Sequence, residues 1–239
     1  MGNDFTRHFE LGVHYSKARK KKMNLVNIKW LFRFFFGNKS YLFYFFYSFY
    51  YKFISYNHEM FNNFTNSNTQ IVIEGYPRSA NSSTTSHFHN FNPNVNIAHH
   101  HHVPAQIIRG VESFTPIIVL IRNPIEAIAS FKCYEPNISL TLAIKAYISF
   151  YKTILPYKSG FIVASFPQVI LDFDVVIARL NKKFKTNFKE GITRQLLSEQ
   201  ISPENEMVRM ELKQDKYAKL LVKAFELYQI FLTIESNQS

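Results

Sequence analysis

The chain has 239 residues, of which 46% are hydrophobic and 17% aromatic, and it carries a formal net charge of +11. This apolar content excludes wholesale disorder, and the length allows one sizeable core with an appendage. Residues 1–60 hold ten Lys or Arg against three Asp or Glu, so the charge belongs mainly to an N-terminal extension. Because abundant Phe, Tyr, Asn and Lys are typical of an AT-rich coding sequence, we expect no nucleic-acid partner.

This basic, aromatic extension is predicted to be helical over residues 23–56, where Trp30 stands among many Phe and Tyr. Its aromatic side chains can pack on a core, or they can enter a membrane interface while the cations of residues 17–56 face anionic lipid. The uncharged run at 41–51 is too short for a membrane-spanning helix, which needs roughly 20 residues. With a single cysteine and no apolar leader, we expect a cytoplasmic protein that is either soluble or attached to a membrane surface.

A second domain is predicted over residues 61–239, after an Asn-rich linker at 61–70. Its short apolar runs predict four strands, at 71–74, 94–99, 117–121 and 161–165. Helical patterns lie between and after them, at about 82–91, 124–134, 139–155, 168–185 and 214–234. This alternation predicts an α/β fold, a three-layer, P-loop-like parallel sheet flanked by helices, with ligands binding at the carboxyl ends of the strands.

The loop after the first strand reads EGYPRSANSS over residues 74–83, with small and hydroxyl side chains leading into a helix. A helix N-terminus offers unpaired N–H groups to an anion, and Arg78 adds a forked cation suited to phosphate or sulfate. No Gly-Lys-Ser/Thr closes the loop, so it is not a Walker A motif. Taken alone, the segment is equally consistent with an ordinary capped helix start.

A second polar turn follows the third strand, where Arg122 is succeeded by Asn-Pro at a predicted helix start. Ser130 comes eight residues after Arg122, and the predicted helix can bring it back towards the strand end. The alternative is a capped turn with an arginine that reaches into solvent.

Together the two segments resemble the PAPS-dependent sulfotransferases, whose first motif is Tyr-Pro-Lys/Arg-Ser-Gly-Thr/Asn-Thr and whose second begins Arg-Asn-Pro. The first is matched from Tyr76 to Ser82, with Ala80 in place of Gly, and the second from Arg122 to Ser130. The resemblance implies two sets of contacts to 3′-phosphoadenosine 5′-phosphosulfate (PAPS). Those to the 5′-phosphosulfate come from Arg78, Ser79, Ala80, Asn81, Ser82 and Ser83, and those to the 3′-phosphate from Arg122 and Ser130. The family's C-terminal Arg-Lys-Gly segment is not found.

Four consecutive histidines, His99 to His102, follow the second predicted strand in IAHHHHVPAQ. Their internal position argues against a tag, and no second cysteine or neighbouring carboxylate completes a zinc shell, so we expect no metal. A solvated run and an acid–base site remain open. If the strand continues through the run, His100 and His102 share one face, and His99 shares the other with His101.

The sulfotransferase resemblance favours the acid–base interpretation. Cytosolic members carry Lys-Thr-His-x-Pro, which places His102 at the catalytic base and His100 at the position of the lysine. The implied reaction moves a sulfuryl group from PAPS to a hydroxyl or amine, with Arg78 as a cationic clamp and no metal. The acceptor is not identified, and a glycan or a lipid fits. The alternatives are a P-loop kinase or NTPase-like enzyme and a non-catalytic nucleotide-binding protein of the same fold.

Overall fold

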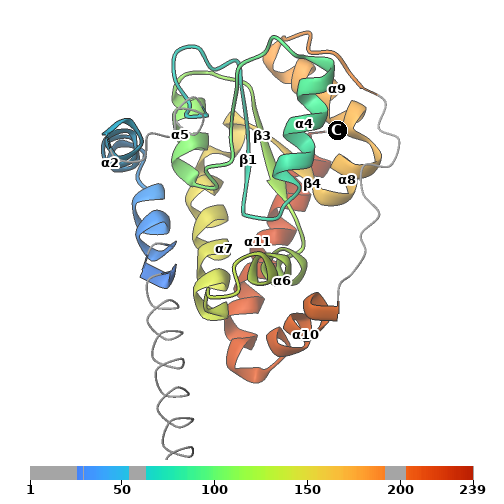
Figure 1. Cartoon of the computed structure of the whole chain (residues 1–239). Helices are drawn as coiled ribbons and strands as arrows, with labels where there is room; N and C mark the ends of the chain where they lie inside the picture. Colours follow the sequence, from blue (N-terminus) through green and yellow to red (C-terminus); the bar gives the residue numbers. More distant parts are fainter. Residues whose placement is uncertain (1–25, 29, 54–62, 192–202, 239) are drawn as a thin grey trace, which may run out of the picture.

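The computed structural model describes residues 26–28, 30–53, 63–191 and 203–238 (Figure 1). Its sheet has four strands, all parallel, in the order β2-β1-β3-β4. They are β1 (Ile71–Gly75), β2 (Ile97–His99), β3 (Ile117–Ile121) and β4 (Ile162–Ser165). The predicted α/β fold with a parallel sheet is confirmed, although β2 is shorter than its pattern suggested.

Helices connect the strands and close the chain. The predicted α4 (Asn81–Phe91), α6 (Pro124–Tyr134), α7 (Leu140–Ile154) and α11 (Asp215–Ser236) are confirmed, and a short 3₁₀ helix, η1 (Leu155–Gly160), follows α7. The single helix expected at 168–185 is two, α8 (Phe166–Leu171) and α9 (Phe173–Phe184), because Asp172 leaves the helical conformation. Two further helices, α5 (Pro104–Glu112) and α10 (Pro203–Leu212), were not predicted.

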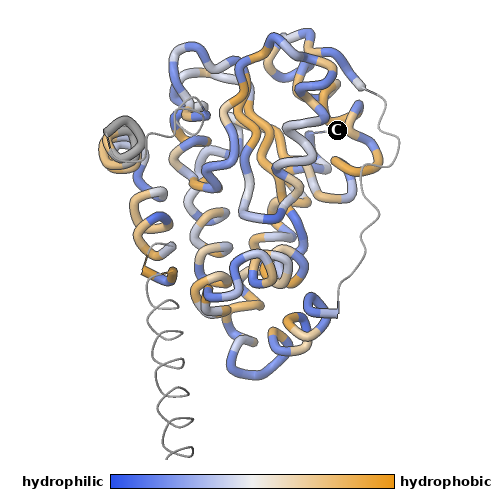
Figure 2. Tube along the Cα trace, in the orientation of Figure 1, coloured by the Kyte–Doolittle hydropathy of each residue, from blue (hydrophilic) through white to orange (hydrophobic). Residues whose placement is uncertain are grey.

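Strands β1, β3 and β4 are buried along their whole length, which explains why their sequences are apolar apart from Glu74 (Figure 2). Alternate side chains enter two separate clusters, as Val119 and Leu120 of β3 illustrate. The first cluster is completed by α5, α6, α7 and α11, and the second by α4, α8 and α9. Helices therefore cover both faces of the sheet and leave the carboxyl ends of the strands for polar loops.

The connections after β1 and β3 diverge although these strands are neighbours. Helix α4 follows β1 onto one face, and α6 follows β3 onto the other. The two strands approach so closely at this end that a Cβ on Gly75 would lie 2.5 Å from the carbonyl oxygen of Leu120. Such a reversal of strand order creates a crevice at the carboxyl ends, where ligands of open α/β sheets bind.

Two helical segments precede the sheet, one over residues 26–28 and 30–37 and the other α2 (Ser40–Phe53). We call them the N-terminal helix pair, and they confirm the predicted helical extension within the described residues. Residues 17–25, 29 and 54–56 of the predicted contact segment lie outside the described residues. Trp30, Phe34 and Phe43 of the pair are buried, and Trp30 meets Phe131 of α6 edge to face at 5.0 Å. Within the part of the chain that is described, no helix is both long and apolar enough to cross a membrane.

Candidate functional site

The loop after β1 is anchored beneath by Tyr76, which is fully buried and donates its hydroxyl to the carbonyl of Ala143 at 3.0 Å. Above it, Arg78 and Ala80 have φ angles of 66° and 69°, in the left-handed region. Such alternation aligns successive backbone N–H groups into an anion-binding concavity. Glycine adopts such an angle without strain, whereas the Cβ of Ala80 makes it less favourable.

Arg78, Ser130 and Arg122, which the sequence places far apart, meet at the crevice between β1 and β3. The Nε of Arg78 donates to the Oγ of Ser130 at 3.1 Å, and a terminal nitrogen of Arg122 donates to the carbonyl of Arg78 at 3.0 Å. Burial lowers the pKa of Arg122 to about 10, which leaves it cationic at neutral pH. The sequence did not reveal the aromatic supports, Phe166 under Arg122 at 4.2 Å and Tyr134 beside Arg78 at 5.4 Å.

Some hydroxyl and amide groups of the loop hold its backbone in place, and others are exposed. Asn81 donates its amide to the carbonyl of Tyr76 at 3.0 Å, and this contact holds the loop against the start of α4. The hydroxyl of Ser79 is buried and lies beside the hydroxyl of Tyr151, which donates to the carbonyl of Leu120 at 2.8 Å. Ser82 is exposed and contacts His100, while Ser83 is half-buried beside it on α4.

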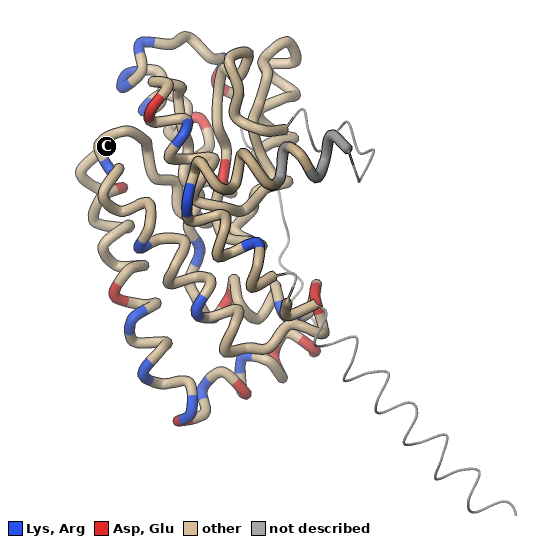
Figure 3. The backbone as a smooth tube through the Cα atoms, turned by 90° about the vertical axis from the view of Figure 1, so that its left-hand side faces the viewer, with Lys and Arg blue, Asp and Glu red and all other residues tan. Residues whose placement is uncertain are grey.

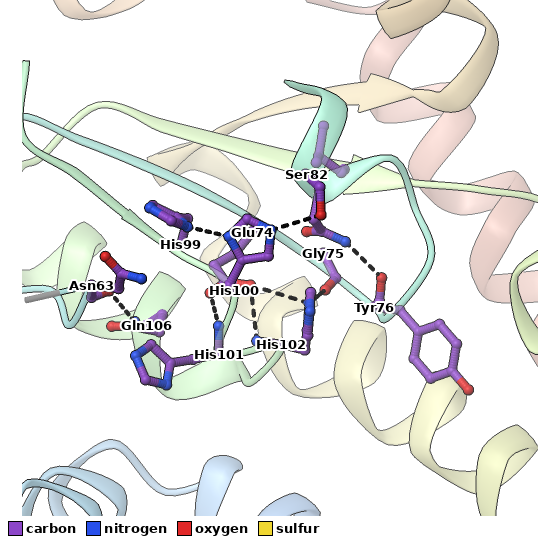
Figure 4. Close-up of polar contacts among 12 residues, drawn as sticks. Asn63, Glu74, Gly75, Tyr76, Ser82, His99, His100, His101, His102 and Gln106 are labelled. Atoms are coloured by element: carbon purple, nitrogen blue, oxygen red, sulfur yellow. Dashed lines mark hydrogen bonds and ion pairs between the residues drawn. The ribbon is translucent and has the colours of Figure 1, made fainter. Parts of the chain in front are cut away.

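The histidine run does not continue the strand, so the strand-alternation argument for it was wrong. Strand β2 ends at His99, and His100 and His102 have φ angles of 64° and 53°. Their rings are nevertheless neighbours, 5.9 Å apart, as expected for a shared site (Figure 4). His101 turns away and stacks on Phe64 at 4.0 Å. His99 lies against His100 at 4.5 Å and not beside His101, contrary to the prediction.

This unusual backbone is held by two residues that sequence reasoning missed, Glu74 and Arg33. The carboxylate of Glu74 accepts from the backbone N–H groups of His101 at 2.7 Å and His102 at 3.0 Å. Arg33 of the N-terminal helix pair donates its Nε to the carbonyl of His101 at 3.0 Å. Complete burial raises the pKa of Glu74 to about 8. A charged residue inside the apolar strand IVIEG was the signal available.

The ring of His102 is fixed in one orientation. Its Nδ1 lies 3.0 Å from the carbonyl oxygen of Gly75, which can only accept, so Nδ1 carries the hydrogen and Nε2 keeps its lone pair. Burial lowers the pKa of His102 to about 3, so the ring is neutral at physiological pH. Both ring nitrogens of His100 have neighbours, Ser82 at 2.9 Å and the Nδ1 of His99. The Nε2 of His102 is therefore the ring nitrogen of the pair that is left to accept a proton, and burial makes it a weak base.

A polar cavity of about 520 Å³ lies beside the histidine segment, between α4 and the edge strand β2. Its lining consists of amides, hydroxyls and imidazoles with two apolar residues, namely Asn63, Asn66, Asn68, Thr69, Thr85, Ser86, His89, Val95, Asn96, Ile97 and His99. None of these is Lys, Arg, Asp or Glu. The buried hydroxyl of Thr85 has no hydrogen-bond partner in the described structure, and His99 connects the cavity to His100.

Over the residues that the structure describes, no group of three His, Cys, Asp or Glu is placed to hold a metal ion. No family model, curated protein or solved structure matches the chain. The site combines a loop with two residues in the left-handed region, two arginines, a neutral imidazole whose Nε2 keeps its lone pair, and an adjoining cavity whose lining carries no Lys, Arg, Asp or Glu.

Proposed function

We propose that this protein is a sulfotransferase that moves a sulfuryl group from PAPS to a hydroxyl-bearing acceptor. The observation that carries the proposal is the contact between the two motif segments, Arg78 to Ser130 and Arg122 to Arg78. The segments are 44 residues apart at Arg78 and Arg122, yet they meet where a doubly wound sheet binds its ligand. The three-layer, P-loop-like arrangement around the crevice is part of the same proposal.

Each group has a defined role in the proposed reaction. The acceptor oxygen attacks sulfur, its proton passes to Nε2 of His102, and the bond from sulfur to the 5′-phosphate oxygen breaks. The electron pair remains on that oxygen, so the leaving group is adenosine 3′,5′-bisphosphate. Arg78 and the N–H groups of the loop stabilise the charge that develops there, while Arg122 and Ser130 bind the 3′-phosphate. Arg78 keeps its proton throughout, because guanidinium is not an acid at neutral pH.

The cavity beside β2 favours an uncharged acceptor with several hydroxyl groups. Side-chain amides and hydroxyls can donate to and accept from a polyol, whereas the lining offers no full charge to an ionic acceptor. Its volume is in the range of small-ligand pockets. A sugar unit of a glycan fits this chemistry, and His99 and His100 connect the cavity to the loop.

A kinase or NTPase-like reaction is the principal alternative, and the geometry around β3 disfavours it. Magnesium–ATP enzymes of this fold class place an acidic metal ligand after a strand beside the phosphate loop. Here β3 is followed by Arg122, a cation that would repel Mg²⁺ and attract a phosphate. The loop also lacks the lysine that contacts the β- and γ-phosphates.

Thermal unfolding with adenosine 3′,5′-bisphosphate, compared with ATP–Mg²⁺, tests the proposal on wild type, Arg122→Ala and Ser130→Ala. At a bisphosphate concentration a hundredfold above Kd, the wild type should gain about 2.7 kcal/mol of stability. Both variants should require a higher nucleotide concentration for the same gain in stability. Ser130→Ala is the milder change, since Arg122 also supports the loop backbone.

Stabilisation by ATP–Mg²⁺ alone would refute the sulfotransferase assignment. Stabilisation by the bisphosphate without transfer from PAPS to any of a panel of hydroxyl and amine acceptors would favour a non-catalytic nucleotide-binding protein. Transfer that survives Arg122→Ala unchanged would contradict the assigned role of the second motif.

A further inference from the structure

The N-terminal helix pair is hydrophobic on both sides, and one of these sides packs on the core. Trp30, Phe34 and Phe43 face the core. The opposite side exposes large apolar side chains, which we call the outer face: Ile28, Leu31, Phe32, Phe35, Tyr41, Phe45, Phe46 and Phe49. Each of these is at least 42% exposed. A helix that is apolar all round is normally buried, so this face calls for a partner.

The outer face is continuous across the two helices. Phe36 contacts Phe32 at 4.1 Å on its own helix and Phe46 of α2 at 5.0 Å, and Phe46 in turn contacts Phe45 at 5.2 Å. Lys39, between the helices, is exposed and sits 5.7 Å from the ring of Phe35. The aromatic surface therefore carries a cation at its margin, and aromatic rings beside cations are characteristic of groups at the membrane–water interface.

In the N-terminal part of the sequence, the charges between Glu10 and Glu59 have one sign. The sequence has no Asp or Glu between Glu10 and Glu59, and nine Lys or Arg in the same interval. In the described part of the pair the charged residues are likewise Lys or Arg (Figure 3). A protein partner with an apolar surface would satisfy the aromatic rings without requiring this charge. An anionic bilayer satisfies both, because cations near its surface gain free energy while rings enter the headgroup layer.

We propose that the outer face docks this protein on an anionic lipid bilayer, with the helix pair lying in the interface. The inner face stays on the protein, because Trp30, Phe34 and Phe43 are already buried there. The docking surface is close to the candidate site, since Gly37 packs against Val103 and Arg33 holds the carbonyl of His101. The proposal is independent of the sulfotransferase reaction, because it rests on the exposed rings and the charge around them.

Flotation of the full chain with vesicles tests the docking surface. Vesicles of phosphatidylcholine alone are compared with vesicles that contain phosphatidylserine, at low and high salt. The test variant is Phe32→Ser/Phe35→Ser/Phe45→Ser, and the matched control is Phe114→Ser/Leu171→Ser, two exposed apolar residues outside the outer face. We expect binding to anionic vesicles that weakens with salt, falls at least about tenfold in the test variant and is unchanged in the control.

Trp30, the only tryptophan, reports whether the pair stays packed on the protein. Its emission should be the same in wild type, in the test variant and on vesicles. No binding to anionic vesicles, or equal loss in the control, would overturn the proposal. If wild type is a dimer that the test variant converts to monomers, and neither binds vesicles, the outer face is covered by a second copy and the lipid proposal fails.

Discussion

The two loops of the candidate site share a backbone conformation, but different contacts hold them in place. Arg78 and Ala80 after β1, and His100 and His102 after β2, each place alternate residues in the left-handed region. The first loop is closed mainly by its own neighbours, through bonds to the carbonyl of Tyr76, and Arg122 adds one bond from outside, to the carbonyl of Arg78. The second is clamped from outside by Glu74 and Arg33. A loop of the first kind can be predicted from a motif, whereas one of the second kind depends on distant residues.

The largest expected effect is on the rate of sulfuryl transfer, which depends on the second loop more than nucleotide binding does. Replacing His102 with Ala should lower the rate of sulfuryl transfer by about a hundredfold to ten-thousandfold, the usual contribution of a general base. Affinity for adenosine 3′,5′-bisphosphate should change much less, because the contacts among Arg78, Ser130 and Arg122 do not involve the imidazole, which bonds to Gly75 before the loop. Single-turnover transfer and bisphosphate titration measure the two quantities separately.

His102→Asn serves as the second variant, since Asn tolerates the left-handed conformation better than most residues. The same loss in both variants would exclude local misfolding as its cause. His100→Ala should retain more transfer than either. If His102→Ala is fully active and His100→Ala is not, the base is His100, and the free Nε2 of His102 has another role.

The next effect concerns Glu74, which holds the second loop, and is measured as the pH dependence of the free energy of unfolding. The pKa of Glu74 is raised from 4.5 to about 8, so the folded protein retains a proton that the unfolded chain releases. The contribution of Glu74 to the free energy of unfolding is greatest below pH 4.5. It falls by about 1.4 kcal/mol per pH unit between pH 4.5 and pH 8, where it is lost. Glu74→Gln cannot ionise, so the free energy of unfolding of wild type minus that of the variant should fall from pH 5 to pH 8.

The histidines act in the opposite direction, and they contribute little to this difference between pH 5 and pH 8, where His99 and His102 both stay neutral in the folded protein. Burial lowers the pKa of His99 to about 4 and of His102 to about 3, so they destabilise the fold as pH drops below about 6.5 in both proteins. Glu226→Gln, on the exposed side of α11, controls for the residue change. A difference that stays flat across this range would mean that Arg33 keeps Glu74 ionised, and the clamp would then be an ion pair.

The sequence predicted the sheet and the first loop because their signals are local. β-branched runs indicated each strand, and Pro124 marked the start of α6 at the correct residue. The motif at 76–82 supplied the residues that meet Arg122 and Ser130. These features depend on neighbours within a few positions, so one sequence is sufficient to read them.

The conformation of the second loop could not be predicted from local signals. Alternation predicted that His100 and His102 would be neighbours, and they are, but through left-handed turns and not through a strand. The position of His99 was wrong for the same reason. Nothing near the histidines indicated that Arg33, 68 residues earlier, would hold the backbone of His101. Pro104 was a local signal that was overlooked, since proline suits the first turn of a helix and α5 begins there.

The smallest expected effect concerns strain in the first loop. Ala80 stands at φ 69°, where an alanine Cβ is unfavourable and glycine is not. Ala80→Gly removes this strain but gives the unfolded chain more freedom, so the net gain in stability should be about 0.5–1 kcal/mol. The matched control is Ala146→Gly, buried in α7, which should lose about 1 kcal/mol because its backbone is already helical. Chemical denaturation measures both. A loss at position 80 would show that the methyl group makes packing contacts worth more than the strain, and the first loop would then depend on tertiary contacts as much as the second.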